Sequence, residues 1–327
     1  MLVKQTWLGI GAGILAGALW GLVFLAPELA SGFDAMQLAA GRYLVYGLVA
    51  AVLLAPSWRR VAPRLGRREW RTLFWLALCG NIVYYLFLAS AVRAGGVAMA
   101  SLVIGLLPLA VTLAGRRDRG AVPLRRLLPS LLLGLAGLLC ISWESLRAPG
   151  QGALPGLACA LGALASWTVY AVANSRTLAR LEAVSAHEWS LLTGVVTGAQ
   201  GLLLALPAFL FAGRMHAAAE WLAFGGLVAA VAVFCSVIGN GLWNYASRAL
   251  PLSLMGQMIV FETIFAALYG FLWEARWPTS AESAALVLLV GGVVSCAAVH
   301  RTAGKPEGAG EGAGEGAAAR SSAPAAR

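Results

Sequence analysis

Two groups of polar and aromatic side chains stand at helical spacing inside apolar segments of the chain. In each group the members occupy positions i, i+3 and i+4, which share one face of a helix. The first group is Asn81, Tyr84 and Tyr85, and the second is Asn240, Trp243 and Asn244. Such side chains can hold a small amphipathic solute, whose body stacks while its head group is hydrogen-bonded. The alternative is that they only link neighbouring helices. We expect them to line a substrate cavity.

One carboxylate, Glu262, interrupts a long apolar run, with Met258 one helical turn before it. A carboxylate inside a membrane-spanning segment costs several kcal/mol, so it is usually turned toward the protein interior or a water-filled path. Three roles for Glu262 stay open: proton coupling, a structural acceptor for a neighbouring helix, and a ligand for a substrate ammonium group. We place both residues in the expected cavity.

Arg42 is the one basic residue well inside an apolar segment, 34–55. Its guanidinium could reach the outer interface along its own apolar stem, hold a substrate carboxylate, or pair with Glu28 or Glu262. Tyr46 lies one turn further along and shares the helix face of Arg42. Arg42 and Tyr46 are therefore also candidate cavity residues.

Glycines recur every four residues near the start of the chain, at Gly9, Gly13, Gly17 and Gly21. They give one flat helix face that a second helix can approach closely, and tight packing is a better account of them than substrate contact. Trp20 stands beside this face and can point into a neighbouring cavity.

The helices that must position these residues follow from the composition. The chain has 327 residues, 60% hydrophobic and 12% charged, with a mean hydropathy of +0.79. A soluble domain carries about 25% charged residues, so the sequence predicts an all-α membrane protein. A helical span needs roughly 20 apolar residues. The ten expected spans are 7–26, 34–55, 72–92, 97–115, 127–143, 153–174, 188–212, 221–246, 252–273 and 281–299.

The net charge of +10 is concentrated in loops between spans, chiefly 56–71 and 116–126. Basic loops beside apolar spans mark the cytoplasmic side, which predicts that both termini are cytoplasmic. These loops lack the interleaved aromatic residues and folded platform of a nucleic-acid site, so we expect no nucleic-acid partner.

Neither the cysteines nor the tail point to chemistry. The five cysteines and three histidines show no metal-ligand spacing, so we expect no disulfide framework, metal site or cofactor. The Gly, Ala and Glu repeat of residues 301–327 cannot bury a core and predicts a disordered cytoplasmic tail.

The two halves of the chain resemble each other. At one offset Arg93 superposes on Arg248. Separately, near the start of each half, LAGALWG resembles LGALASWT, which places Trp20 opposite Trp167. Trp167 therefore joins the candidate cavity residues. Five spans per half is an odd number, so the second copy must be inverted in the bilayer, and inverted repeats meeting at a central site are a recurring transporter plan. We expect two five-helix repeats, 1–148 and 149–300.

The segment FETIFAALYGFLWEARWPTSAESAALVLLVGGVV, residues 261–294, resembles the C-terminal signature of EamA-type members of the drug/metabolite transporter superfamily. Glu262 and Glu274 match the two glutamates of that signature, whereas Thr263 stands where the family has proline and Trp273 where it has glycine. The family's first-helix Trp-Gly, second-helix Arg and fourth-helix Pro are matched by Trp20-Gly21, Arg42 and Pro108.

This resemblance implies a ten-helix exporter of small metabolites in the bacterial inner membrane, working by alternating access. The branch that exports aromatic and neutral amino acids is the most similar, because tryptophans and tyrosines are available for the cavity. The expected partners are a small-molecule substrate and the lipid bilayer, with the protein acting as a monomer or weak dimer.

Other functions remain open. Within the superfamily these are export of cationic drugs, nucleosides or sugar-linked metabolites. An integral membrane enzyme needs clustered acids or His-acid pairs near a membrane face, and the sequence offers only His187 beside Glu188. A channel is disfavoured by the inverted repeat. We therefore expect a transporter and no enzyme.

Overall fold

The fold is that of a computed structural model, which describes residues 2–115, 123–147, 153–178, 180–181, 184–211, 215–249 and 252–303. Every regular element in these residues is helical, which confirms the predicted all-α class. Residues 304–327 of the tail predicted to be disordered and much of the basic loop 116–126 lie outside the described residues, whereas 301–303, predicted to belong to the tail, continue the last helix.

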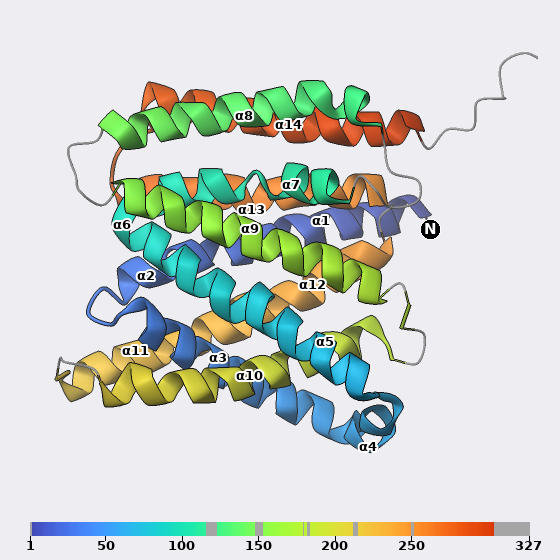
Figure 1. The fold of residues 1–327 in the computed structure, drawn as a ribbon, viewed down its shortest axis with the longest axis vertical. Coiled ribbons are helices and arrows are strands. Elements are labelled where there is room, and N and C mark those ends of the chain that lie inside the picture. The colour runs from blue at the N-terminus through green and yellow to red at the C-terminus, as the bar shows by residue number, and fades with distance from the viewer. Residues whose placement is uncertain are drawn as a thin grey trace, which may run out of the picture.

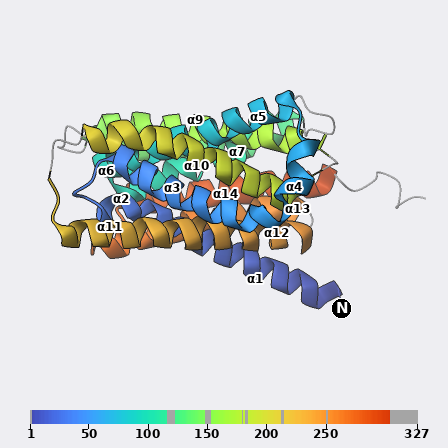
Figure 2. The ribbon, with the colours of Figure 1, turned by 90° about the horizontal axis from the view of Figure 1, so that it is seen from below.

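The helices lie side by side with their long axes running in similar directions, and the N-terminus lies at the same end of the bundle as α4 (Figures 1 and 2). The longer elements are α1 (Leu2–Gly21), α3 (Ala35–Leu54), α5 (Arg67–Ala77), α6 (Tyr84–Ile104), α7 (Leu107–Ala114), α8 (Leu124–Arg147), α9 (Ala153–Leu178), α10 (Ala186–Leu210), α11 (Ala218–Ala230), α12 (Gly239–Ala249), α13 (Leu252–Trp273) and α14 (Ser280–Ala303). Short elements between them are η1 (Leu22–Phe24), α2 (Ala26–Leu29), η2 (Ala55–Ser57), α4 (Trp58–Val61) and η3 (Ala62–Arg64).

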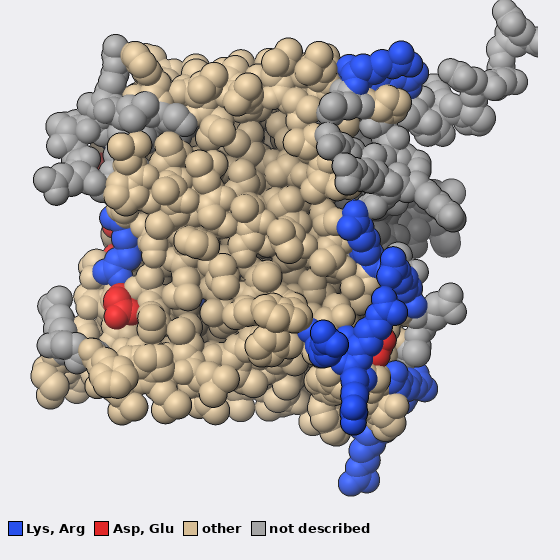
Figure 3. Space-filling view, viewed as in Figure 1, with Lys and Arg blue, Asp and Glu red and all other residues tan. Residues whose placement is uncertain are grey.

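The exterior of the bundle is apolar. Leu203 is 67% exposed and Val287 is 71% exposed, and Figure 3 shows a broad surface without charged residues between two ends that carry them. Among the described residues, six helices are long and apolar enough to cross a membrane. They cover 7–29, 35–64, 67–104, 154–174, 187–210 and 218–243. An apolar exterior around long helices is the form that a lipid bilayer requires.

Helix starts are fixed by capping boxes, in which the first residue and the residue three positions on bond each other's backbone N–H groups. The pairs are Asp34 with Gln37 at α3, Ser185 with Glu188 at α10, and Thr279 with Glu282 at α14. The capping pattern is visible in the sequence and accounts for where these three helices begin.

Glycine allows the closest helix contacts in the bundle. Gly13, Gly17 and Gly21 of α1 face α13, where an added Cβ on Gly17 would lie 2.9 Å from the backbone nitrogen of Glu262. The predicted packing role of these three glycines is confirmed. Between α3 and α10 the approach is closer still, because a Cβ on Gly198 would lie 2.6 Å from the Cα atom of Gly47.

We expect Gly198→Ala to destabilise the protein, because the backbones of α3 and α10 would have to separate. Overpacking of this kind costs about 1–3 kcal/mol. The matched control is Gly225→Ala in α11, where an added Cβ has nothing within 4 Å and should be neutral or stabilising. Melting temperatures of the two purified variants in detergent check the prediction, and equal melting temperatures would contradict it.

The region predicted as a loop at 56–71 is largely helical, which corrects the expected start of the third span at 72. The span begins at Arg67, and the Gly66 N–H donates to the Glu69 carboxylate at 2.8 Å. Charged residues in the first turn of α5 concealed the helix from a search for apolar runs. The predicted break between the third and fourth spans is confirmed within α6, where Gly96 adopts a φ of +83° that favours glycine.

Two segments depart from α-helical geometry, and no pattern in the sequence indicated them. Both η4 (Leu78–Val83) and η5 (Val231–Ile238) are π-helical. The first joins α5 to α6, and the second joins α11 to α12. They occupy corresponding places in the third helix of each predicted repeat. Single π-helical turns inside helices are frequent at functional sites.

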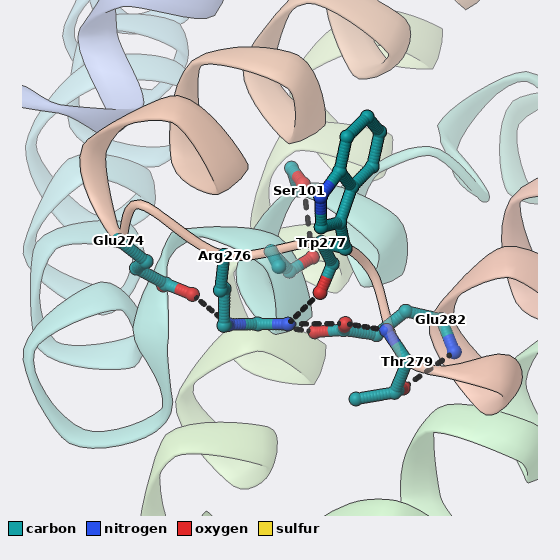
Figure 4. Close-up of polar contacts among 7 residues, drawn as sticks. Ser101, Glu274, Arg276, Trp277, Thr279 and Glu282 are labelled. Carbon is teal, nitrogen blue, oxygen red and sulfur yellow. Dashed lines mark hydrogen bonds and ion pairs between the residues drawn. The ribbon is translucent and has the colours of Figure 1, made fainter.

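The connection from α13 to α14 is held by charges (Figure 4). Arg276 donates two hydrogen bonds of 2.6 Å to the two carboxylate oxygens of Glu282 and one of 2.6 Å to Glu274. A bidentate arginine–carboxylate pair fixes orientation as well as charge. Glu274, expected at the membrane interface, thus belongs to a salt-bridge cluster at the end of the bundle.

Candidate functional site

Arg42 lies inside the bundle and is only 9% exposed, so its guanidinium does not reach the outer interface. Its Cζ atom lies 4.4 Å from the centre of the Tyr85 ring and 5.3 Å from that of Tyr43. One nitrogen, Nη2, donates to Ser236 Oγ at 3.4 Å. The other two, Nε and Nη1, are buried without a hydrogen-bond partner among the described residues. A guanidinium with free, desolvated donors is prepared to bind an anionic group.

Glu262 faces the same region from α13. Its charge lies within electrostatic range of Arg42 and Tyr84, and the carboxylate has neither an ion pair nor a hydrogen bond with any described residue. Its side chain is partly exposed although it lies deep in the helix. These observations favour a carboxylate directed toward a ligand over a structural acceptor for a neighbouring helix.

The π-helical segments bring the walls of this region together. Their backbone carbonyls accept hydrogen bonds from side chains of other helices: Cys79 O from Ser166 Oγ at 2.8 Å, Asn81 O from Tyr43 Oη at 2.9 Å, and Cys235 O from Trp20 Nε1 at 2.9 Å. Each of the two segments is therefore tied to the first helix of the opposite half.

A second aromatic wall is formed by Trp20 and Trp243, whose ring centres are 5.2 Å apart. Met258 packs in a small cluster beside Trp243, between α1, α12 and α13. The bond from Trp20 to the carbonyl of Cys235 joins this wall to Ser236, the partner of Arg42. Trp20, Trp243 and Met258 thus border the region that holds the two charges.

The other predicted site residues have the following contacts. Tyr46 is buried, and its hydroxyl lies by the carbonyl of Ser190 at 3.5 Å and by the side chain of Asn240. Asn81 donates from Nδ2 to Thr197 Oγ1 at 2.8 Å, so its amide links η4 to α10. Trp167 contacts Tyr170, with ring centres 5.8 Å apart, and the structure shows it in no contact with Arg42 or Glu262. The side chain of Asn244 lies outside the described residues.

Sequence reasoning missed Tyr43 and Ser236 as members of the site. Tyr43 faces Arg42 through its ring and η4 through its hydroxyl. Ser236 stands four residues before Asn240, a spacing that puts the two on one helix face. That signal was present in the sequence, whereas the π-helical turn that carries Ser236 was not.

This arrangement can hold a small molecule that carries both charges. The guanidinium of Arg42 would bind a carboxylate, and the carboxylate of Glu262 would bind an ammonium group. Because burial strengthens each interaction, both ends of such a molecule would be recognised.

Three comparisons with known proteins show what the chain resembles. The protein called Inner membrane protein YtfF of Escherichia coli (strain K12) is 33% identical over 308 residues, which span 88% of this chain and 94% of that protein. A solved crystal structure covers 91% of this chain and 99% of its own with a TM-score of 0.62 and 22% identity, a likeness of fold alone. The profile of the EamA-like transporter family matches residues 7–143 and 154–297. The chain belongs to the EamA-like transporter family.

Proposed function

We propose that the protein exports small metabolites across the bacterial inner membrane, and that its substrates are aromatic and neutral amino acids. The observation that carries the substrate class is the buried Arg42, with two unpartnered nitrogens, in electrostatic range of the unpaired Glu262. An α-amino acid carries the complementary carboxylate and ammonium groups on one carbon. A cationic drug would use Glu262 and leave the Arg42 charge uncompensated, which is costly in a buried site.

Alternating access is supported by reciprocal packing of the two halves. The second helices of the predicted repeats pack together as α3 on α10, and the fifth helices as α8 on α14. The first helix of each half packs on the third helix of the other, α1 on α12 and α9 on α6. Together with the two segments matched by the family profile, this exchange pattern supports ten spans in two inverted repeats around a central site.

The proposed orientation places both termini in the cytoplasm. Lysine and arginine gather at the end of the bundle where α4 and α5 lie (Figure 3), the same end as the N-terminus (Figure 1). Basic residues mark the cytoplasmic side of bacterial membrane proteins. The relative from Escherichia coli is itself named an inner membrane protein.

The proposal is tested by counterflow uptake into proteoliposomes with three labelled compounds that share one ring. Phenylalanine carries both charges, 3-phenylpropanoate lacks the ammonium group and phenethylamine lacks the carboxylate. We expect saturable uptake of phenylalanine, with at least tenfold weaker competition by either analogue, since a charge-assisted hydrogen bond contributes about 1.5–3 kcal/mol.

Two results would contradict this assignment. Preferred uptake of phenethylamine would indicate an exporter of organic cations. Absence of uptake for all three compounds, from protein that melts cooperatively, would redirect the search to nucleosides and other metabolites of the superfamily.

A further inference from the structure

Side chains from the N-terminal part of α5 line an open groove that is separate from the candidate site. The groove has a volume of about 610 Å³ and is lined by Arg67, Arg68, Arg71, Thr72 and Trp75. Positions 68, 71, 72 and 75 follow the spacing i, i+3, i+4 and i+7, so their side chains share one helix face. Two guanidinium groups, a hydroxyl and an indole ring therefore share this face, and Arg67 lines the groove beside them.

These arginines are available to a ligand. Arg67, Arg68 and Arg71 are exposed, and none of them forms an ion pair or side-chain hydrogen bond with a described residue. Arg60, in the neighbouring α4, is instead paired with Glu188 of α10. Three like charges within two turns repel one another, and an anion placed between them relieves that repulsion while accepting charge-assisted hydrogen bonds.

The position of the groove selects the kind of anion. Arg67 begins a helix that is long and apolar enough to cross a membrane, and Trp75, one wall of the groove, is 58% exposed next to the exposed Phe74. Tryptophan at this depth is typical of the level at which lipid headgroups meet the hydrocarbon region. The arginines then lie at the level of the phosphates and the tryptophan beside the first carbons of the acyl chains.

We propose that this groove binds the phosphate-bearing headgroup of an anionic membrane lipid. The arginines hold the phosphate oxygens, and Trp75 contacts the acyl chain. The Thr72 hydroxyl donates to the carbonyl of Arg68 at 2.9 Å, and its oxygen can still accept a hydrogen bond from a headgroup hydroxyl. Basic pockets of this kind at the membrane surface recognise lipids with more than one phosphate as well as simple anionic lipids.

The proposal is tested on the full chain in detergent by native mass spectrometry, with cardiolipin, phosphatidylglycerol and phosphatidylcholine as probes. The test variant is Arg68→Gln with Arg71→Gln. The matched control is Arg125→Gln with Arg126→Gln, because both of these arginines are exposed at the start of α8 and their loss removes the same charge outside the groove. We expect the test variant to lose retention of cardiolipin and phosphatidylglycerol by about tenfold or more, since each basic residue contributes about 1 kcal/mol.

The control variant and wild type should retain both anionic lipids equally and prefer them to phosphatidylcholine. Equal loss in the test and control variants would show a response to net charge alone and overturn the proposal, as would equal retention in all three proteins. Displacement of the lipids by an excess of soluble glycerol phosphate would identify a site for free phosphate and would also overturn it. Trp75→Ala, which removes no charge, should weaken retention of the anionic lipids only a few-fold.

Discussion

Replacement of Arg42 by methionine is expected to weaken saturable amino acid uptake strongly while leaving the protein at least as stable as wild type. The guanidinium is buried with two nitrogens that lack partners, and a desolvated cation without full hydrogen bonding costs folding energy. An apolar side chain of similar length removes that cost. Loss of a two-pronged bond to a substrate carboxylate should raise the half-saturation concentration for phenylalanine about 100-fold.

Two further variants separate binding from structure. Ser236→Ala removes the side chain that accepts from Arg42 and should change uptake by no more than a few-fold. Arg42→Lys keeps the charge but loses the planar group that lies over the Tyr85 ring, so partial recovery is expected. The measurements are uptake kinetics and melting temperature on the same preparations. A methionine variant that loses both uptake and stability would instead assign Arg42 to the scaffold.

Glu262→Gln is expected to remove the discrimination between phenylalanine and 3-phenylpropanoate. In the wild type the uncharged end of 3-phenylpropanoate would leave the Glu262 carboxylate without an ammonium partner, which penalises that analogue. Glutamine keeps the shape and removes the charge, so affinity for phenylalanine should fall about tenfold while that for the analogue is unchanged or improved. Competition curves with both compounds measure the change.

A matched control for this variant is Glu274→Gln, because Glu274 lies in the same helix-to-helix connection as Arg276 and outside the site. It should leave the discrimination intact. Uptake should also be recorded with and without a pH gradient. Loss of gradient-stimulated uptake in Glu262→Gln, with unchanged discrimination between the two compounds, would make Glu262 a proton carrier and contradict its assignment as a ligand for ammonium.

Features that depend on repeated apolar residues and glycine spacing could be predicted from the sequence. Long apolar runs indicated the helices, and the spacing of Gly13, Gly17 and Gly21 indicated their contact face. The expectation that side chains at i, i+3 and i+4 share a face stays a prediction, because Asn81 lies in the π-helical η4, and spacing within one helix does not say which neighbour that face meets. Asn81 therefore bonds to Thr197, a residue of α10 that no local pattern connects with it.

The position of Arg42 shows a second limit. Its burial depends on the ring of Tyr85 and the hydroxyl of Ser236, which come from helices far away in the sequence. Sequence reasoning could therefore name the possible partners of the guanidinium without choosing among them. The π-helical turns were not predicted because they depend on tertiary contacts, such as the bond from Trp20 to the carbonyl of Cys235, rather than on residue type.

The π-helical turn at η4 sets the direction in which the aromatic residues after it point. An α-helix advances about 100° around its axis for each residue, so removing the surplus residue of a π-helical turn would rotate everything beyond it by about that angle. Tyr84 and Tyr85 follow η4 directly, and the same rotation would carry the Tyr85 ring away from Arg42. The π-helical geometry of these six residues therefore sets the side of the helix from which the Tyr85 ring meets Arg42.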